Sequence, residues 1–337
     1  MRFIMKRHLF ILMSGTAFIL SGCVHDNSDK TSVISKRYVH KYGYPVPKEE
    51  WQEHNYPGQV ITALSDGVTV TATYENGKLH GPTTHTFAHS QAIEKCIVYN
   101  QGQKVKETSY NSNSMPLQEW IQLSPQRYSL TSWYVEGCPM MVEEYAGNEL
   151  IEGQYFTALN EIEARVEKGN GIRISRDQTG SLLSKEMIED GYTVKKETYY
   201  PSGAPESIAY YALGKLNGNK QTFTANGEPL ALEEWVNGQL HGKATYFRNG
   251  NRYLEISYLN NQKNGTERHY TDGDLLTQEI HWENDLKHGP TIYYTDSDIQ
   301  QHWFYAGQLV SKKKFDDYNQ MDQMVADISD DVKIHIR

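Results

Sequence analysis

The sequence YALGKLNG at residues 211–218 recurs as WVNGQLHG at 235–242, as YLNNQKNG at 258–265 and as WENDLKHG at 282–289. The aromatic residues that open these copies are 24, 23 and 24 residues apart: Tyr211, Trp235, Tyr258 and Trp282. Tyr305 follows 23 residues later. Each copy ends on a glycine: Gly218, Gly242, Gly265 and Gly289. Columns of residues that share one step are the signature of a repeat protein.

Each repeat unit alternates apolar and polar residues. Leu254, Ile256 and Tyr258 fall on one face of an extended chain, whereas Glu255 and Ser257 fall on the other. A period of two predicts β-strands. Two strands and a tight turn per unit predict an antiparallel meander, in which stacked hairpins bury an aromatic stripe that one hairpin cannot bury alone. We expect each repeat glycine to precede a second strand and to leave room for a neighbouring aromatic ring.

The same pattern begins much earlier in the chain. Residues 74–81 read YENGKLHG, with Tyr74, Gly77 and Gly81 in the repeat positions. A step of about 23 residues from Tyr74 to Tyr305 gives about ten units, in one repeat domain at 60–310. Within it, Asp66-Gly67 predicts a type I′ hairpin turn. Residues 155–190 keep their glycines but lose the aromatic residues, and a short helix is possible at 158–166. We interpret this segment as eroded repeats, with an insertion as the alternative.

These positions resemble MORN repeats, whose pattern is an aromatic residue, a turn glycine, a Leu-His-Gly-like step and another aromatic residue. MORN units usually carry a second glycine two residues later, where this chain has Thr83, Lys220, Ala244, Glu267 and Thr291. In this respect the chain is similar to a divergent bacterial MORN variant, whose members often carry an antitoxin label. The resemblance implies an all-β fold: an elongated antiparallel β-meander of tandem MORN-like hairpins, forming a single-layer ribbon with a C-terminal capping helix.

The N-terminus resembles a bacterial lipoprotein signal peptide. Arg2, Lys6 and Arg7 precede an apolar run over residues 9–20, which ends in the lipobox-like Leu-Ser-Gly-Cys23. The resemblance implies removal of residues 1–22 and attachment of acyl chains such as palmitate to Cys23. An ordinary signal peptide with a chance cysteine is the alternative. Because Val24, and not aspartate, follows the cysteine, we expect a lipoprotein of the outer membrane.

Short segments flank the repeats. Residues 23–37 are polar and unpatterned, which predicts a flexible tether. Residues 38–59 are predicted to form an N-terminal cap with one or two helical turns around Trp51, and a binding surface is the alternative. At 311–337 we predict a C-terminal cap. There Met321, Met324, Val325 and Ile328 recur at helical spacing and are expected to cover the last edge of the sheet, or alternatively to bind a partner.

The charge of the chain excludes some classes of partner. It carries 33 Lys and Arg residues against 42 Asp and Glu residues. Removal of residues 1–22 takes away three positive charges and leaves a net charge of about −12. Binding of nucleic acid requires Lys and Arg to neutralise phosphates, so no nucleic-acid partner is predicted. The same charge disfavours docking on anionic lipid, so we expect contact with the membrane through the lipid anchor.

No catalytic motif or cofactor fingerprint is present, and we predict neither an enzyme nor a cofactor or metal site. His80, His241 and His288 share one repeat slot with Asn217 and Asn264, which indicates a turn position rather than a metal ligand. The neighbouring carboxylates Glu143/Glu144 and Glu233/Glu234 point to opposite faces of a strand. We interpret them as solvated side chains and not as a catalytic pair.

The sequence therefore predicts a non-enzymatic, lipid-anchored envelope protein that presents its repeat surface to a protein or a cell-wall-associated partner. A periplasmic hydrolase that uses His and carboxylate groups, and an immunity or antitoxin-type inhibitor, are the alternatives. Cys96 and Cys138 are 42 residues apart, almost two repeat steps. In a regular meander this separation is roughly 19 Å, whereas a disulfide tolerates about 7 Å between Cα atoms. We therefore predict two free, mostly buried thiols.

Overall fold

A computed structural model describes residues 31–271, 274–295 and 298–334, with side chains up to Val325 in the last segment. The signal peptide, the lipobox and Cys23 lie outside the described residues. The chain forms two compact units, one that ends at Thr193 and one that begins at Val194. The repeat domain predicted over residues 60–310 extends over parts of both units.

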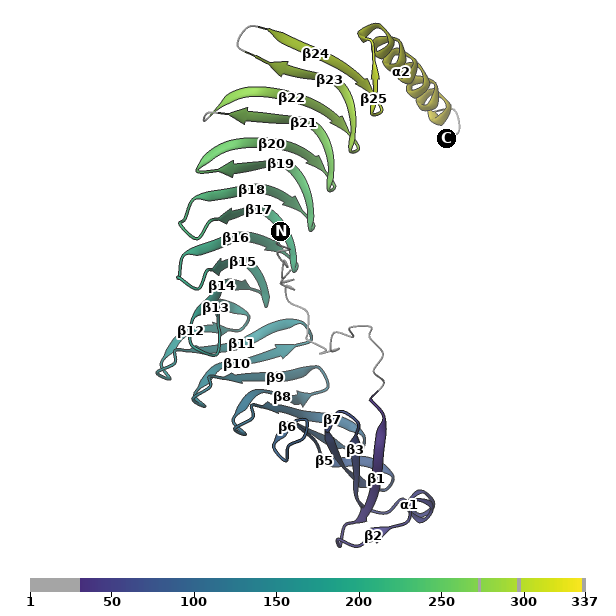
Figure 1. The fold of residues 1–337 in the computed structure, drawn as a ribbon, viewed down its shortest axis with the longest axis vertical. Helices are drawn as coiled ribbons and strands as arrows, with labels where there is room; N and C mark the ends of the chain where they lie inside the picture. The colour runs from purple at the N-terminus through teal and green to yellow at the C-terminus, as the bar shows by residue number, and fades with distance from the viewer. Residues whose placement is uncertain (1–30, 272–273, 296–297, 335–337) are drawn as a thin grey trace, which may run out of the picture. The chain divides into compact units, whose positions relative to one another are not determined.

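The first unit is an antiparallel meander (Figure 1). Its elements are β1 (Val33–His40), β2 (Pro45–Val46), α1 (Lys48–His54), β3 (Gly58–Leu64), β4 (Thr69–Glu75), β5 (Lys78–Thr86), β6 (Ile93–Asn100), β7 (Gln103–Tyr110), β8 (Pro116–Ser124), β9 (Arg127–Trp133), β10 (Pro139–Ala146), β11 (Glu149–Phe156), β12 (Ile162–Glu167), β13 (Asn170–Arg176) and β14 (Leu182–Glu189). From β3 onward each strand pairs with the next one along the chain. The first strand, β1, pairs with β3.

The second unit continues the same pattern of pairing. Its elements are β15 (Tyr192–Tyr199), which starts at the boundary, β16 (Pro205–Ala212), β17 (Lys215–Phe223), β18 (Pro229–Val236), β19 (Gln239–Arg248), β20 (Asn251–Leu259), β21 (Gln262–Thr271), β22 (Leu275–Glu283), β23 (Leu286–Tyr294), β24 (Ile299–Tyr305), β25 (Gln308–Val310) and α2 (Lys312–Ile334). Each strand pairs antiparallel with its successor. The predicted all-β meander of hairpins with a C-terminal helix is confirmed.

The eroded segment folds as ordinary hairpins, because β11 to β14 fill residues 149–189 without an inserted element. The short helix considered at residues 158–166 does not form. The N–H of Thr157 donates to the carbonyl of Glu161, and the N–H of Asn160 donates to that of Thr157. Asn160 has φ 61°, which turns the chain directly into β12. A hydrophobic core forms here from Leu150, Tyr155, Val166 and Ile188.

Both caps contain the expected helix, but their details differ from the predictions. The predicted tether extends to Arg37, whereas β1 already begins at Val33. Trp51 of α1 is buried against Val46 and Val60, as expected of a cap. At the other end, Met321, Met324 and Val325 are 61%, 54% and 66% exposed, so this apolar stripe does not cover the sheet. Instead, Phe315 packs on Trp303, with the two ring centroids 4.9 Å apart.

Two-residue turns join the strands of many hairpins. Asn237/Gly238, Asn260/Asn261 and Asn284/Asp285 each have two consecutive positive φ angles, as a type I′ turn requires. Consecutive turns are linked, since the N–H of Asn261 donates to the carbonyl of Leu240 over 2.9 Å. The type I′ prediction for Asp66-Gly67 is wrong, because only Gly67 has positive φ there. A wider turn closes that hairpin, from Leu64 to Val68.

The repeat glycines lie inside strands, at positions where the pairing register shifts. Gly218, Gly242, Gly265 and Gly289 have φ angles of 108°, 109°, 101° and 107°. On the preceding strand, the pairing register shifts opposite each glycine, next to the aromatic residue that opens the repeat. Our expectation that these glycines precede the second strand is therefore wrong, because they lie inside it. Each of them is the register partner of an aromatic residue on the following strand. A Cβ atom on Gly265 would lie 3.1 Å from the Cβ of Ser257, and only glycine adopts this φ at low cost.

Candidate binding surface

One face of the second unit carries a continuous row of buried and half-buried side chains. Register partners lie on the same face of a sheet, and the pairings connect the following residues, which we call the central row: Lys220, Glu233, Ala244, Ile256, Glu267, Ile280 and Thr291. From Ala244 to Thr291 these side chains are at most 5% exposed. The substitutes for the second MORN glycine thus form the floor of this face.

The column aromatics stand on the same face, two residues along each strand from the central row. Trp235 pairs with Gly218, Tyr258 with Gly242 and Trp282 with Gly265. The next position, opposite Gly289, is held by Phe304 and not by Tyr305. We call Tyr211, Trp235, Tyr258, Trp282 and Phe304 the aromatic column. All five rings are half-buried, so part of each remains open to a ligand.

Lysine ammonium groups lie over several rings of the column. The Nζ of Lys263 is 4.6 Å from the ring centroid of Trp282, and that of Lys287 is 5.9 Å from Trp282 and 5.1 Å from Phe304. Lys220 lies 5.9 Å from the ring of Trp235. Cation–π contacts of this kind hold a ring and a charge together at the surface. A partner would therefore meet aromatic faces flanked by ammonium groups.

The central row also holds carboxylates, and these are neutralised. The Nζ of Lys263 donates to Glu267 over 2.6 Å, and the Nε2 of His269 lies 2.7 Å from the same carboxylate. Burial alone raises the pKa of Glu267, but the bonds to Lys263 and His269 outweigh burial and lower it. Glu233 accepts the indole N–H of Trp235 over 3.2 Å. These carboxylates position the column and offer no free general base.

The paired carboxylates of the first unit behave differently from the prediction. Glu144 is partly exposed and bonds to Arg127 over 3.0 Å. Glu143 is 0% exposed, so our interpretation of it as a solvated side chain is wrong. Its carboxylate accepts bonds from Arg173, from the hydroxyl of Tyr145 and from the hydroxyl of Tyr155. The sequence did not reveal that Glu143 is buried and paired, because its partner Arg173 lies 30 residues away, in the eroded segment.

The histidine slot contacts the next turn along the sheet. The Nδ1 of His241 is 3.3 Å from Asn260, and the Nδ1 of His288 accepts the N–H of Ala306 over 3.5 Å. In the described residues no group of three or more His, Cys, Asp or Glu side chains has the arrangement of a metal site. Cys96 and Cys138 are free and half-buried, as predicted except for the depth of burial.

The fold and this surface define an antiparallel β-meander repeat protein. Residues 234–252, which run from the end of β18 into β20, match the MORN repeat. No curated protein matches the chain. Among solved structures it is similar to a chain in the crystal structure of TcdB2-TccC3-Cdc42, with 11% identity and a TM-score of 0.19. The match covers 81% of this chain and 22% of that chain. Within the described residues, no helix combines the length and the hydrophobicity needed to cross a membrane.

Proposed function

We propose that this chain is a non-enzymatic lipoprotein of the bacterial cell envelope, anchored through Cys23, which binds a protein or cell-wall-associated partner on its repeat surface. Its excess of acidic residues disfavours nucleic acid as the partner.

 Val24, in place of an aspartate after Cys23, supports the outer membrane as the membrane to which the chain is anchored. The single observation that carries the proposal is the aromatic column, with its half-buried rings and flanking lysines.

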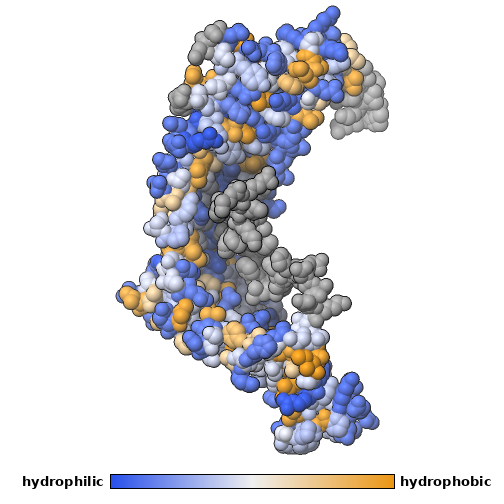
Figure 2. Space-filling view, in the orientation of Figure 1, coloured by the Kyte–Doolittle hydropathy of each residue, from blue (hydrophilic) through white to orange (hydrophobic). Residues whose placement is uncertain are grey.

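The chemistry of the column supports binding by contact with ring faces. Aromatic side chains offer large contact areas at a small cost in conformational entropy, and they are enriched where proteins bind partners. Figure 2 shows hydrophobic residues in small groups separated by hydrophilic ones. The rings of the column suit a partner that stacks on them and pairs with polar groups near the lysines beside them.

The binding proposal is tested by capture from envelope extract, with the immobilised chain as bait. Trp235→Leu removes one ring of the column, and we expect it to reduce capture of the partner. Tyr294→Leu is the matched control, because Tyr294 is a half-buried aromatic residue three positions from Thr291 of the central row, on the opposite face of the same sheet. Equal capture by the wild type and Trp235→Leu, with both variants folded, would exclude the column as the binding surface.

The anchor is tested separately by Cys23→Ser. We expect this variant to fold normally and to leave the membrane fraction, because one acyl chain binds a bilayer only marginally and stable attachment needs more than one. Membrane pelleting of the variant that withstands mild salt would place the anchor elsewhere in the chain.

A further inference from the structure

The last full strand of the second unit has an open edge. One side of β24 pairs with β23 from Ile299 to Phe304. On its other side, β25 pairs only with Trp303, Phe304 and Tyr305. Among the described residues, no strand pairs with the remaining part of that side, at residues 299–302. Unpaired N–H and C=O groups on a strand edge are a template for pairing with another chain.

The turn between β24 and β25 fixes which backbone groups point to this edge. Ala306 and Gly307 form a two-residue turn with φ angles of 45° and 83°, flanked by the pair Tyr305 and Gln308. In such a hairpin the flanking pair is hydrogen-bonded, and every second residue along the strand points the same way. The N–H and C=O of Gln301 therefore point to the open edge. The N–H of Ile299 is already bonded to Asp298, over 2.8 Å.

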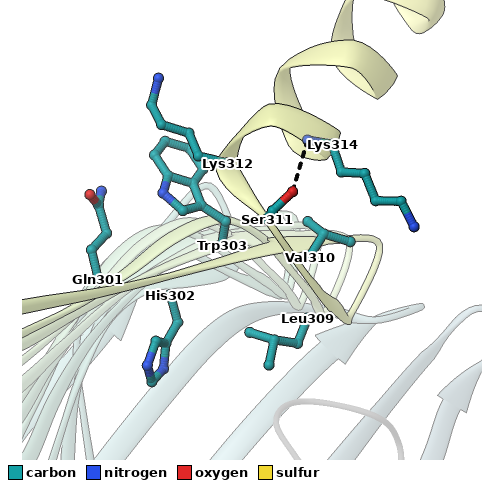
Figure 3. Close-up of a pocket in the computed structure, with 8 residues that line it drawn as sticks. All are labelled: Gln301, His302, Trp303, Leu309, Val310, Ser311, Lys312 and Lys314. Atoms are coloured by element: carbon teal, nitrogen blue, oxygen red, sulfur yellow. Dashed lines mark hydrogen bonds between the residues drawn. The ribbon is translucent and has the colours of Figure 1, made fainter.

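A hollow of about 630 Å³ lies at this edge, where the chain leaves β25 and enters α2 (Figure 3). It is lined by Gln301, His302, Trp303, Leu309, Val310, Ser311, Lys312 and Lys314. Figure 3 shows Lys312 beside the ring of Trp303, and its Nζ lies 5.6 Å from the ring centroid. A strand added in line with β25 would thus run through this hollow.

The charge beside the hollow selects the occupant. Lys312, Lys313 and Lys314 follow one another at the start of α2, and all three are exposed. Lys312 pairs with Asp316 over 3.3 Å, in an exposed contact that contributes little stability. A peptide residue opposite Gln301 would share its face of the sheet with Trp303, on which Lys312 and Phe315 lie. Acidic side chains at such alternate positions would reach the lysines.

We propose that the open edge of β24 binds an extended acidic peptide of a partner protein, which adds to the sheet as one further strand. The backbone of Gln301 supplies hydrogen bonds, and the lysine cluster at residues 312–314 selects acidic side chains. Strand addition of this kind combines main-chain bonds for affinity with side-chain contacts for specificity. This site lies on the edge of the sheet and is independent of the aromatic column.

Fluorescence anisotropy with a labelled peptide of alternating Glu and Val residues tests the proposal. We expect saturable binding to the purified chain that weakens as salt is added, since salt screens exposed charges. A peptide of alternating Lys and Val residues should not bind. Gln301→Pro removes the outward N–H, which takes no part in the β23 pairing, and should weaken binding about tenfold.

Charge variants provide a second, independent measurement. Lys313→Glu with Lys314→Glu should also weaken binding about tenfold. The matched control is Lys78→Glu with Lys215→Glu, which makes the same change of net charge at two exposed lysines away from the edge and should bind as the wild type does. Trp235→Leu should leave peptide binding unchanged, so failure at the edge and failure of the aromatic column are separable.

Three outcomes would overturn the proposal. One is the absence of peptide binding, and another is equal binding of the acidic and basic peptides. The third is wild-type affinity in both Gln301→Pro and the Lys313/Lys314 double variant. Sedimentation of the chain alone tests whether a second copy of the chain occupies the edge instead. A dimer that is lost in Gln301→Pro, together with no peptide binding, would assign the edge to that second copy.

Discussion

Replacement of Arg173 with methionine should destabilise the first unit strongly. The guanidinium donates to both oxygens of Glu143, over 2.7 and 3.1 Å, and lies 3.7 Å from Glu186. Glu143 is fully buried, and the hydroxyls of Tyr145 and Tyr155 complete its hydrogen bonds. Burial lowers the pKa of Arg173, but the nearby carboxylates outweigh it and raise the pKa well above its ordinary value. Without Arg173, the carboxylate of Glu143 loses its principal countercharge.

The expected loss follows from the burial of that carboxylate. Removal of one partner of a buried ion pair costs about 3–5 kcal/mol. For a unit of this size, such a loss lowers Tm by about 6 to 20 °C. Hydrogen exchange followed by mass spectrometry measures the effect locally, and peptides from β10 to β14 should lose protection. Peptides from β19 and β20, which belong to the second unit, serve as the internal reference.

The control and the refuting result are both available in the same unit. Arg127→Met breaks an ion pair in which both side chains are exposed, with Glu144 on β10, and should cost at most about 1 kcal/mol. If Arg173→Met cost no more than Arg127→Met, the network would not stabilise the fold. The double variant Glu143→Met with Arg173→Met should recover part of the loss, because it leaves no unpaired charge.

Three further predictions concern local features. Gly265→Ala should lower the free energy of unfolding by about 1–3 kcal/mol, since φ at this position is 101° and a Cβ atom would press on Ser257. Gly214→Ala, also at positive φ but with open space around it, should lower the free energy less in the same denaturant titration. Burial raises the pKa of Glu255, but the bonds to Arg252 and Tyr270 outweigh burial and lower it. The stabilisation by Glu255 is therefore complete above pH 4.5, the ordinary pKa of glutamate, and is lost as the pH falls through the lower pKa of the folded state. Glu255→Gln should reduce the dependence of the free energy of unfolding on pH in this acidic range. Mass spectrometry of alkylated, non-reduced protein should find Cys96 and Cys138 both free, and Cys96 should react slowly because burial raises the pKa of its thiol; an intact bridge would contradict the meander register.

The regular part of the fold was predictable because its determinants are local. Alternation of side chains specifies strands, and pairs such as Asn237-Gly238 specify two-residue turns, whatever the rest of the chain does. The prediction of a type I′ turn at Asp66-Gly67 was wrong because the same dipeptide also fits a wider turn, in which only the glycine needs positive φ. Spacing alone also favoured Tyr305 over Phe304, since it does not reveal which residue faces Gly289.

The polar interior was not predictable, because it depends on contacts between distant strands. Period-two alternation places Glu143 on one face of β10, but whether that face is covered depends on β13, which carries Arg173. The prediction that the apolar stripe of α2 covers the sheet was wrong for a related reason. Helical spacing identifies a stripe but not the surface on which the helix rests, and Phe315 makes that contact instead of Met321.

The two units share a feature: carboxylates of their strands are paired with cations on the same sheet. Glu107 and Glu143 lie on one register line of the first unit, and Glu233 and Glu267 lie in the central row of the second. A cation on the same sheet lies within 4 Å of each of these four carboxylates. A general base needs a carboxylate that is free to accept a proton from a substrate, whereas these are already paired. A partner lying over such a face meets neutral ion pairs and ring faces, so its recognition depends on shape and stacking more than on net charge.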